Sequence, residues 1–239
     1  MFTLIPLLIP LLASAQSGPE WLARVDAAAT PAQDAHVVLS VSLTDDRGRT
    51  AERTLEIWQK GEHLRLVRLT DPPRLAGVGL LVDAEDAVHL YLPAYERTRR
   101  VVGDQRSGAF MGTDISMEDL ARTTFSRDYR AAVLSEDEAT VRLALTPLDP
   151  SAHDYASSVL TVQRADALWT GLEHLDAEGA PMRRVELSDY RVVDGYAFAH
   201  KMTVTDLKKG RTSVATASSL SFDAGLSDEL FTTTNLSRP

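Results

Sequence analysis

The chain has 239 residues, 44% of them hydrophobic, and a formal net charge of −9 at pH 7. Such an acidic surface repels phosphate backbones, which argues against a nucleic-acid partner, and it offers no polybasic patch for anionic lipid headgroups. The absence of cysteine excludes disulfide bonds, thiolate metal sites, thiol catalysis and an acyl anchor on an N-terminal cysteine.

The start of the chain differs from the rest: it reads MFTLIPLLIPLLASA, carries no charged side chain and ends in the small-residue pattern Ala-Ser-Ala. An apolar run this short predicts a secretory signal peptide cleaved after Ala15, because a membrane-spanning helix needs about 20 apolar residues. The run lacks the usual Lys or Arg, and the alternative is a buried helix, which Pro6 and Pro10 disfavour. We expect residues 1–15 to be removed and residues 16–239 to form one domain outside the cytoplasm.

A short helix and then a series of strands are predicted after the cleavage point. Pro19 and Glu20 open a stretch with apolar residues at helical spacing, which predicts a helix ended by Pro31. From there apolar and polar residues alternate, as in strands with one buried face. The predicted strands span residues 37–44, 50–59, 64–70, 80–83, 88–92, 141–146, 159–164, 168–176, 182–193, 198–207 and 212–222. Tight polar turns, the strongest being Asp194-Gly195, make this an antiparallel meander in a mainly β fold.

Residues 104–127, which we call the lid segment, interrupt this series because they show no period of two. Ser116 followed by Asp119 resembles a capping box and predicts a short helix through Leu120. Long segments without strand pattern in compact domains are usually functional lids or disordered, and this one is too apolar for disorder. We expect a folded lid or plug.

Catalytic and metal sites find little support in the sequence. The six histidines show no metal-ligand spacing, and no catalytic triad order or nucleotide-binding glycine loop stands out. Asp114, Glu118 and Asp119 cluster in the lid segment, where the acid–base pair of a hydrolase is conceivable, but helix capping explains Asp119 without chemistry. We expect no catalytic residue, no metal and no cofactor, so an enzyme is not predicted.

The densest positive run is Arg97-Thr98-Arg99-Arg100. A solvated strand face is the favoured interpretation, and a docking site for an acidic partner or a phosphate headgroup is the alternative.

The predicted sheet is too wide for its own helices to cover. Many strands have one apolar face, whereas helical residues are few, near Trp21, near Ser116 and at 227–230. A curved sheet with an apolar concave face must bury that face against helices or against a hydrophobic ligand. The imbalance suggests a cavity for a lipid.

The expected ligand contacts are apolar strand residues and two residues of the lid segment: Leu39, Val41, Leu55, Ile57, Leu66, Tyr91, Phe110, Met111, Leu143, Leu145 and Met202. Met suits variable cargo because its side chain adapts its shape. The alternative for Phe110 and Met111 is a permanent core that plugs the end of the barrel. Gly108 and Gly112 flank these two residues and are candidate hinges.

Three stretches resemble a known family: residues 73–81 (PRLAGVGLL), 89–100 (HLYLPAYERTRR) and 110–120 (FMGTDISMEDL). They are similar to the proline–glycine–apolar strand, the YLP…RR strand pair and the FMGSDFSxxDL segment of outer-membrane lipoprotein-sorting proteins, relatives of the periplasmic lipoprotein carrier. Thr113 replaces the usual Ser and Ile115 the usual aromatic residue. Weaker similarity extends over nearly the whole mature chain.

The resemblance implies a half-open antiparallel β-barrel with a small helical lid, and a monomeric periplasmic carrier without enzymatic activity. Its partners would be lipid or lipoprotein acyl chains, shielded on their way toward the outer membrane, and an inner-membrane transporter. The alternative is a periplasmic adaptor of a lipid-export transporter that acts by protein–protein contact, with the run near Arg97 as its contact.

Overall fold

The computed structural model describes residues 16–29 and 33–238, so the predicted signal peptide and Pro31 lie outside the described residues. The described residues form α1 (Gly18–Ala29), α2 (Met117–Ala121), α3 (Thr233–Leu236) and short 3₁₀ turns. Each of these helices is too short to cross a membrane. The predicted N-terminal helix is confirmed as α1, which buries Trp21, Leu22 and Val25.

Within residues 33–238, thirteen antiparallel strands make up one sheet. They are β1 (Asp34–Thr44), β2 (Thr50–Lys60), β3 (Leu64–Asp71), β4 (Gly79–Val82), β5 (Val88–Leu92), β6 (Arg97–Val101), β7 (Tyr129–Glu136), β8 (Thr140–Pro147), β9 (Ser157–Gln163), β10 (Trp169–Leu175), β11 (Pro181–Val193), β12 (Tyr196–Asp206) and β13 (Arg211–Phe222). The predicted mainly β fold is confirmed. The sequence pattern missed β7, because only its first residue is buried and no alternation results.

The order of the strands explains why the barrel stays open. It runs β6-β5-β4-β3-β2-β1-β13-β12-β11-β10-β9-β8-β7, so two meanders are joined where β1 pairs with β13. The two edges, β6 and β7, are consecutive in the chain but do not pair. The lid segment therefore has to run from one edge of the sheet to the other.

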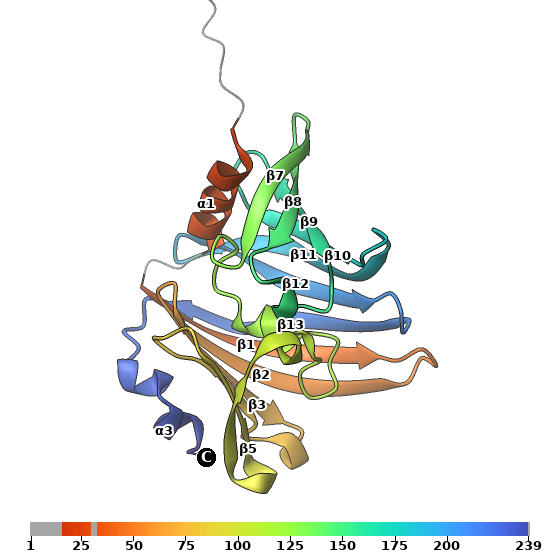
Figure 1. Ribbon diagram of the computed structural model, residues 1–239. Helices are drawn as coiled ribbons and strands as arrows, with labels where there is room; N and C mark the ends of the chain where they lie inside the picture. The colour runs from red at the N-terminus through yellow and green to blue at the C-terminus, as the bar shows by residue number, and fades with distance from the viewer. Residues whose placement is uncertain (1–15, 30–32, 239) are drawn as a thin grey trace, which may run out of the picture.

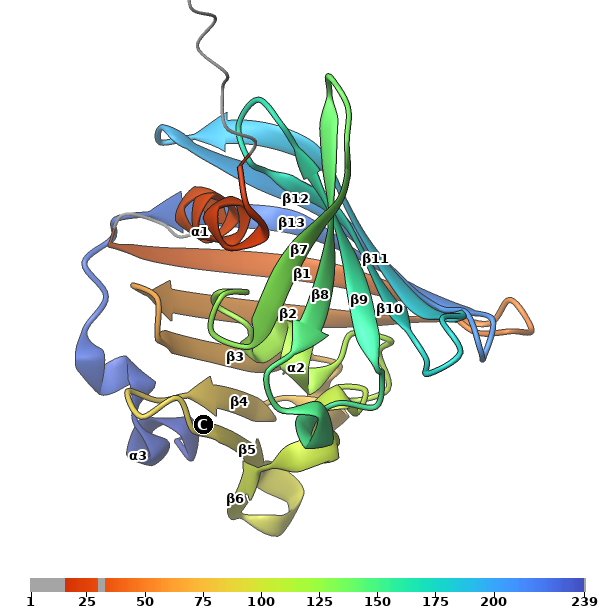
Figure 2. The ribbon, with the colours of Figure 1, turned by 45° about the horizontal axis from the view of Figure 1, so that its top comes forward.

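Figures 1 and 2 show the consequence of this order. The sheet is strongly curved, and α1 and α2 lie within its concave side (Figure 2). The C-terminal segment with α3 packs against the outside of β3 and β4 (Figure 2). The predicted architecture of a half-open barrel with a helical lid is confirmed.

Alternation along the strands divides the apolar residues between two clusters. In β3, Val67 and Leu69 belong to the large core on the concave side, whereas Leu66 belongs to a small cluster on the convex side with Phe231 and Leu236. Successive side chains of a strand point to opposite faces, which accounts for this division. Both faces of β3 are therefore apolar.

The Asp194-Gly195 hairpin is confirmed between β11 and β12. Both residues have positive φ, 52° and 89°, and Val193 pairs with Tyr196 across the turn. A two-residue turn of this kind favours Asp-Gly because each position requires a left-handed backbone.

Candidate functional site

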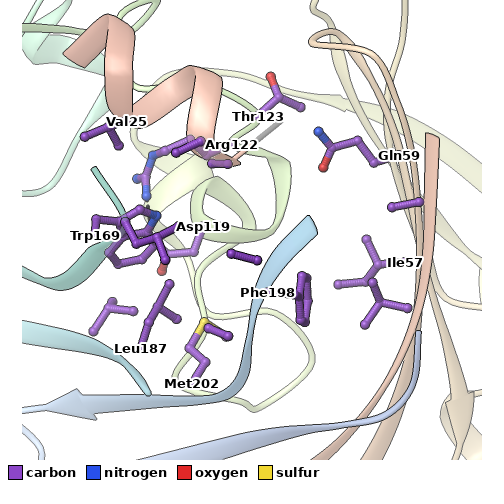
Figure 3. A pocket seen from close by; sticks show the side chains of 18 of the residues that line it. Val25, Ile57, Gln59, Asp119, Arg122, Thr123, Trp169, Leu187, Phe198 and Met202 are labelled. Atoms are coloured by element: carbon purple, nitrogen blue, oxygen red, sulfur yellow. Dashed lines mark hydrogen bonds and ion pairs between the residues drawn. The ribbon is translucent and has the colours of Figure 1, made fainter. Parts of the chain in front are cut away.

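A cavity of about 250 Å³ lies between the concave face of the sheet and the helices α1 and α2 (Figure 3). Val25 of α1, Ile57 of β2, Leu187 of β11 and Met202 of β12 contribute to its mostly apolar lining, with Trp169 at the start of β10. Apolar cavities of about 150 Å³ already bind benzene, and pockets for larger ligands begin at roughly 300 Å³. The cavity is thus large enough for part of a hydrophobic ligand.

The period of two places the lining residues. Along β2, Leu55, Ile57 and Gln59 point to the concave side, and they pass from the core through the apolar wall of the cavity to a polar position. Along β12, Phe198, His200 and Met202 follow the same rule. β2 and β12 therefore each contribute more than one residue to the wall of the cavity.

Three of the residues expected to contact a ligand line this cavity: Leu39, Ile57 and Met202. Others lie fully buried in the core next to it: Val41, Leu55, Phe110, Leu143 and Leu145. Met111 packs against that core from the lid segment, and Leu66 and Tyr91 belong to the convex cluster on the other face of the sheet. The structure thus places three of the expected residues in the wall of this cavity and the others outside it, and ligand contact remains a prediction for every residue named.

Several lining residues were missed, notably Val25, Trp169, Leu187 and Phe198. Leu187 pairs directly with Met202 across β11 and β12. Its place in an alternating run with Val185 was visible in the sequence. Trp169 follows a turn and Val25 lies on a helix, and no local pattern places either of them opposite the sheet.

Helix α1 is fastened to the chain that follows α2. The carboxylate of Asp26 accepts hydrogen bonds from the backbone N–H groups of Phe125 at 2.6 Å and Ser126 at 3.0 Å. Arg24 lies over the ring of Trp21, 4.3 Å from its centroid. These two hydrogen bonds of Asp26 join α1 to the segment after α2. Val25, Asp26 and Phe125 all line the cavity, so the bonds connect two parts of its wall.

The tight turn of the lid segment is held by one hydroxyl. Met111 and Gly112 both have positive φ, and the Oγ1 of Thr113 donates to the carbonyls of Phe110 at 2.7 Å and Ile115 at 3.1 Å. A serine at position 113 would offer the same hydroxyl, so the difference between Thr113 and the Ser of the segment that this stretch resembles keeps the contact. The hinge role of Gly108 and Gly112 remains a prediction.

The predicted capping box of α2 is confirmed. Ser116 accepts from the backbone N–H of Asp119, and the Asp119 carboxylate accepts from the backbone N–H of Ser116. The same carboxylate lies 3.3 Å from Arg183 of β11 and 3.4 Å from Arg122. Burial raises the pKa of Asp119, but the charges of Arg183 and Arg122 outweigh it, and the net pKa lies below its usual value.

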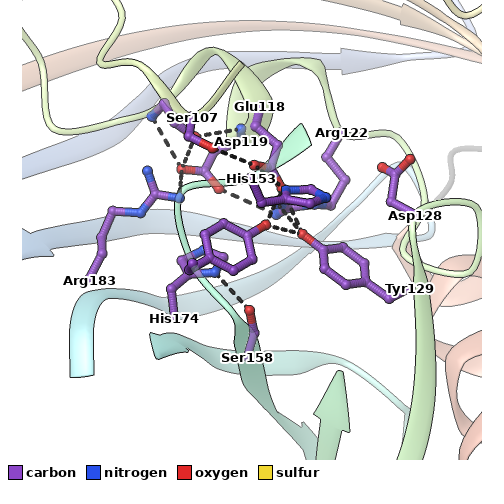
Figure 4. A network of polar contacts seen from close by, with 12 residues as sticks. Ser107, Glu118, Asp119, Arg122, Asp128, Tyr129, His153, Ser158, His174 and Arg183 are labelled. Atoms are coloured by element: carbon purple, nitrogen blue, oxygen red, sulfur yellow. Dashed lines mark hydrogen bonds and ion pairs between the residues drawn. The ribbon is translucent and has the colours of Figure 1, made fainter. Parts of the chain in front are cut away.

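A buried polar network lies beside α2 (Figure 4). The carboxylate of Glu118 accepts hydrogen bonds from Tyr129 at 2.6 Å, Tyr155 at 2.5 Å and Arg122 at 2.8 Å, and it lies 3.1 Å from Nδ1 of His153. Glu118 is only 1% exposed. Tyr129, His153 and Tyr155 come from β7 and from the loop between β8 and β9, so they brace α2 against that half of the sheet, whereas Arg122 lies at the end of α2 itself.

The protonation states suit a brace rather than an acid–base pair. Burial raises the pKa of Glu118, but the hydrogen bond from His153 and the charge of Arg122 prevail and hold it well below its usual range. Burial raises the pKa of the Tyr129 and Tyr155 hydroxyls above their usual range. A carboxylate with such a lowered pKa is a weak base, which disfavours the hydrolase hypothesis for the acids of the lid segment.

His174 lies under this network as a neutral imidazole. Its Nδ1 lies 2.8 Å from the Oγ of Ser158, its ring is 4.0 Å from that of Tyr155, and it is 1% exposed. Burial lowers its pKa to about 3, and the charge of Arg183 acts in the same direction. Its role here is packing and hydrogen bonding.

A second, smaller cavity of about 160 Å³ lies beside Tyr155, His174 and Arg183. Its lining is polar and includes Arg183, Lys208, Lys209 and Arg211. Several of these cations are paired within the protein, for example Arg211 with Asp114 at 3.2 Å. Within residues 16–29 and 33–238, no group of His, Asp and Glu is placed to hold a metal ion.

Comparison with known proteins places this geometry in context. A family model described as an uncharacterized protein matches residues 61–238. Among curated proteins, no match was found. An outer membrane lipoprotein-sorting protein domain from Vibrio parahaemolyticus aligns with a TM-score of 0.83 and 24% identity, over 92% of this chain and 98% of that one.

Two further solved structures share the fold. A DUF1329 family protein from Desulfovibrio piger aligns with a TM-score of 0.82 and 23% identity, over 92% of this chain and 97% of that one. A LolA superfamily protein from Nitrosomonas europaea aligns with a TM-score of 0.76 and 20% identity, over 92% of this chain and 100% of that one. The chain thus belongs to the family whose model spans residues 61–238, and it has the fold of outer membrane lipoprotein-sorting domains and LolA superfamily proteins.

Proposed function

We propose that the protein is a periplasmic carrier that holds the acyl chains of a lipid or lipoprotein beneath α1 and α2 and passes them toward the outer membrane. The observation that carries the proposal is the apolar cavity on the concave side of the sheet. The fold supports it, because similar structures are described as an outer membrane lipoprotein-sorting protein domain and a LolA superfamily protein. The apolar start of the chain, residues 1–15, supports export.

The energetics of a carrier require a loose fit. Burying an acyl chain gives about 0.8 kcal/mol per CH₂, so a dozen methylenes contribute roughly 10 kcal/mol before ordering costs. A cavity that must also release its load benefits from a cover of modest stability. Here Asp26 of α1 is hydrogen-bonded to the lid segment, and the flexible side chain of Met202 lies in the wall of the cavity.

Quenching of tryptophan by brominated acyl chains tests the proposal. Trp169 lines the cavity, whereas Trp58 packs on the convex side. A fatty acyl chain brominated along its length should quench the fluorescence of the protein. In a Trp21→Phe background, used because Trp21 of α1 is buried in the same core, the Trp169→Phe change should remove most of that quenching. Native mass spectrometry of the protein purified from the periplasm should in addition detect lipid that leaves with it on denaturation.

A matched pair of variants separates cavity binding from surface binding. Leu187→Asp places a charge in the apolar wall, whereas Leu134→Asp makes the same change on the exposed strand β7, where Leu134 is 54% exposed. We expect the first variant to bind the acyl chain at least tenfold more weakly and the second to bind like wild type. Equal binding by both variants, or no acyl binding by the wild type, contradicts the carrier.

A second candidate is an adaptor that docks on a membrane transporter, and the edge strand β6 favours it. Arg97, Arg99 and Arg100 are exposed on this unpaired edge. Charged residues on an edge strand also prevent aggregation, which is the simpler explanation. Replacing the three arginines by glutamine should leave acyl binding intact, and loss of transport in cells with binding retained would favour the adaptor.

A further inference from the structure

One half-buried cation at the edge of the cavity has no counter-ion among the described residues. Arg65 of β3 lines the cavity, and no carboxylate of the described residues lies within ion-pair distance of its guanidinium. Its donors go to neutral oxygens instead: the carbonyls of Arg122 at 2.6 Å and Leu120 at 3.2 Å, and the Oε1 of Gln59. The Nε is buried and has no hydrogen-bond partner among the described residues.

The charges around Arg65 are positive as well, so they do not supply the missing anion. Burial lowers the pKa of Arg65 to about 10, and the positive charges of Arg122 and Arg127 act in the same direction. Arg122 and Arg127 each have carboxylate partners, Glu118 and Asp86. A guanidinium removed from water without an anion is costly.

Further polar groups gather at the same end of the cavity. Gln59 and Thr123 are 7% and 6% exposed, both line the cavity, and the Oγ1 of Thr123 has no hydrogen-bond partner among the described residues. In Figure 3 they lie on one side of the cavity, whereas Leu187 and Met202 lie on the opposite side. Gln59 and Thr123 thus mark one polar side of the cavity, while Asp119 and Arg122, which pair with each other, lie beside Trp169 on another.

We propose that the cavity takes an amphiphile with a compact oxyanion, a carboxylate or a phosphate, which binds beside Arg65, Gln59 and Thr123 while its chain lies along Ile57 and Met202. This inference rests on the proposed carrier function, since it specifies the head of the molecule whose tail the cavity holds. Guanidinium is the side chain best suited to such an oxyanion, because its N–H groups match the oxygen geometry.

Headgroup selectivity tests the inference. The probe is N-phenylnaphthylamine, which is uncharged, and it is displaced by four amphiphiles of one chain length: the fatty acid, the alkyl phosphate, the fatty alcohol and the alkyltrimethylammonium. Hydrogen bonds to a charged group contribute about 1.5–3 kcal/mol, so at neutral pH the better anion should bind about 10- to 100-fold more tightly than the alcohol. A preference for phosphate over carboxylate, with competition by inorganic phosphate, identifies a phosphate head; the reverse identifies a carboxylate.

Arg65→Met should reduce the ratio of anion to alcohol affinity to about one, and Arg65→Lys should retain part of it. The matched control is Arg68→Met. Arg68 lies on the same strand but on the convex face, where it likewise donates to two backbone carbonyls, those of Asn235 and Arg238. That variant should keep the wild-type ratio.

The outcomes separate the two proposals. If the alcohol and both anions bind equally to the wild type, the oxyanion site is refuted and the carrier stands. If no amphiphile displaces the probe, the carrier itself fails. If Arg65→Met does not fold, the wild-type ratio of anion to alcohol still decides the question.

Discussion

The carboxylate of Asp26 in α1 accepts a hydrogen bond of 2.6 Å from the backbone N–H of Phe125, ninety-nine residues further along the chain. This bond and its neighbour to Ser126 tie the N-terminal helix to the segment after α2. Because Asp26 and Phe125 both line the cavity, we expect the strength of this tie to influence how readily α1 moves away from it.

Asp26→Asn should loosen α1. An amide keeps one acceptor but presents N–H donors to a second backbone donor, so at least one bond is lost, at a cost of about 1–3 kcal/mol in opening free energy. We expect faster amide hydrogen exchange in residues 18–29 and faster uptake and release of an acyl probe. Glu20→Gln is the control, because the Glu20 carboxylate accepts hydrogen bonds from Ser17, at the start of the same helix. Unchanged exchange in Asp26→Asn would show that apolar packing alone holds α1.

Glu118→Gln should destabilise the fold strongly. The amide loses the charge that pairs with Arg122, and breaking one partner of a buried ion pair costs about 3–5 kcal/mol. Denaturant unfolding at pH 7 measures the loss. Glu173→Gln is the matched control, since Glu173 pairs with Arg184 at 2.7 Å but the two side chains are 24% and 47% exposed, and an exposed pair contributes less than about 1 kcal/mol.

Glu118 should also affect how the free energy of unfolding changes at low pH. The pKa of Glu118 is lower in the folded state than in the unfolded state, so its contribution is complete above the unfolded value near 4.3 and is lost as the pH falls below it. The stability difference between wild type and Glu118→Gln should therefore shrink below about pH 4. A constant difference down to pH 3 would mean that the carboxylate is not charged in the folded protein.

Much of the fold follows from local patterns, and the strands show why. Alternation predicts a strand from its own residues, and the capping box of Ser116 and Asp119 predicts α2 in the same way. Where both faces of a strand are apolar, the sequence does not show which face points to the concave side. In β3, Leu66 and Val67 face opposite clusters. The missed strand β7 has almost no buried residue, so it leaves no alternating pattern.

The cavity required information that no local pattern contains. Leu55 and Ile57 share one face of β2, yet the first is core and the second is cavity wall. The difference arises from what covers each position, and that depends on the pairing of β1 with β13 and on the path of the lid segment between the two sheet edges. The polar side at Arg65 is formed by carbonyls of α2 and its C-terminal end, which a strand pattern cannot reveal.

His174→Asn should make the protein less sensitive to mild acid. The unfolded state takes up a proton on this residue near pH 6.5, whereas the folded state resists until about pH 3. Between those values each pH unit favours unfolding by about 1.4 kcal/mol through this residue. Urea midpoints at pH 7 and pH 5 should therefore fall less in His174→Asn than in wild type. An equal fall of the urea midpoint in His174→Asn and in wild type would show that His174 is charged in the folded protein.

Phe110→Ala should reduce mainly the stability of the fold, whereas Phe198→Ala should reduce mainly the affinity for an acyl chain. Phe110 is fully buried in the core and does not line the cavity, whereas Phe198 is partly exposed and lines it. Removing a buried phenyl ring costs about 3–5 kcal/mol of stability, so Phe110→Ala should unfold at lower urea concentration while the folded fraction binds the acyl probe normally. Phe198→Ala should lose several-fold in affinity and little stability. Weakened binding in folded Phe110→Ala, at unchanged stability, would instead place Phe110 in the ligand contact that its position in the lid segment first suggested.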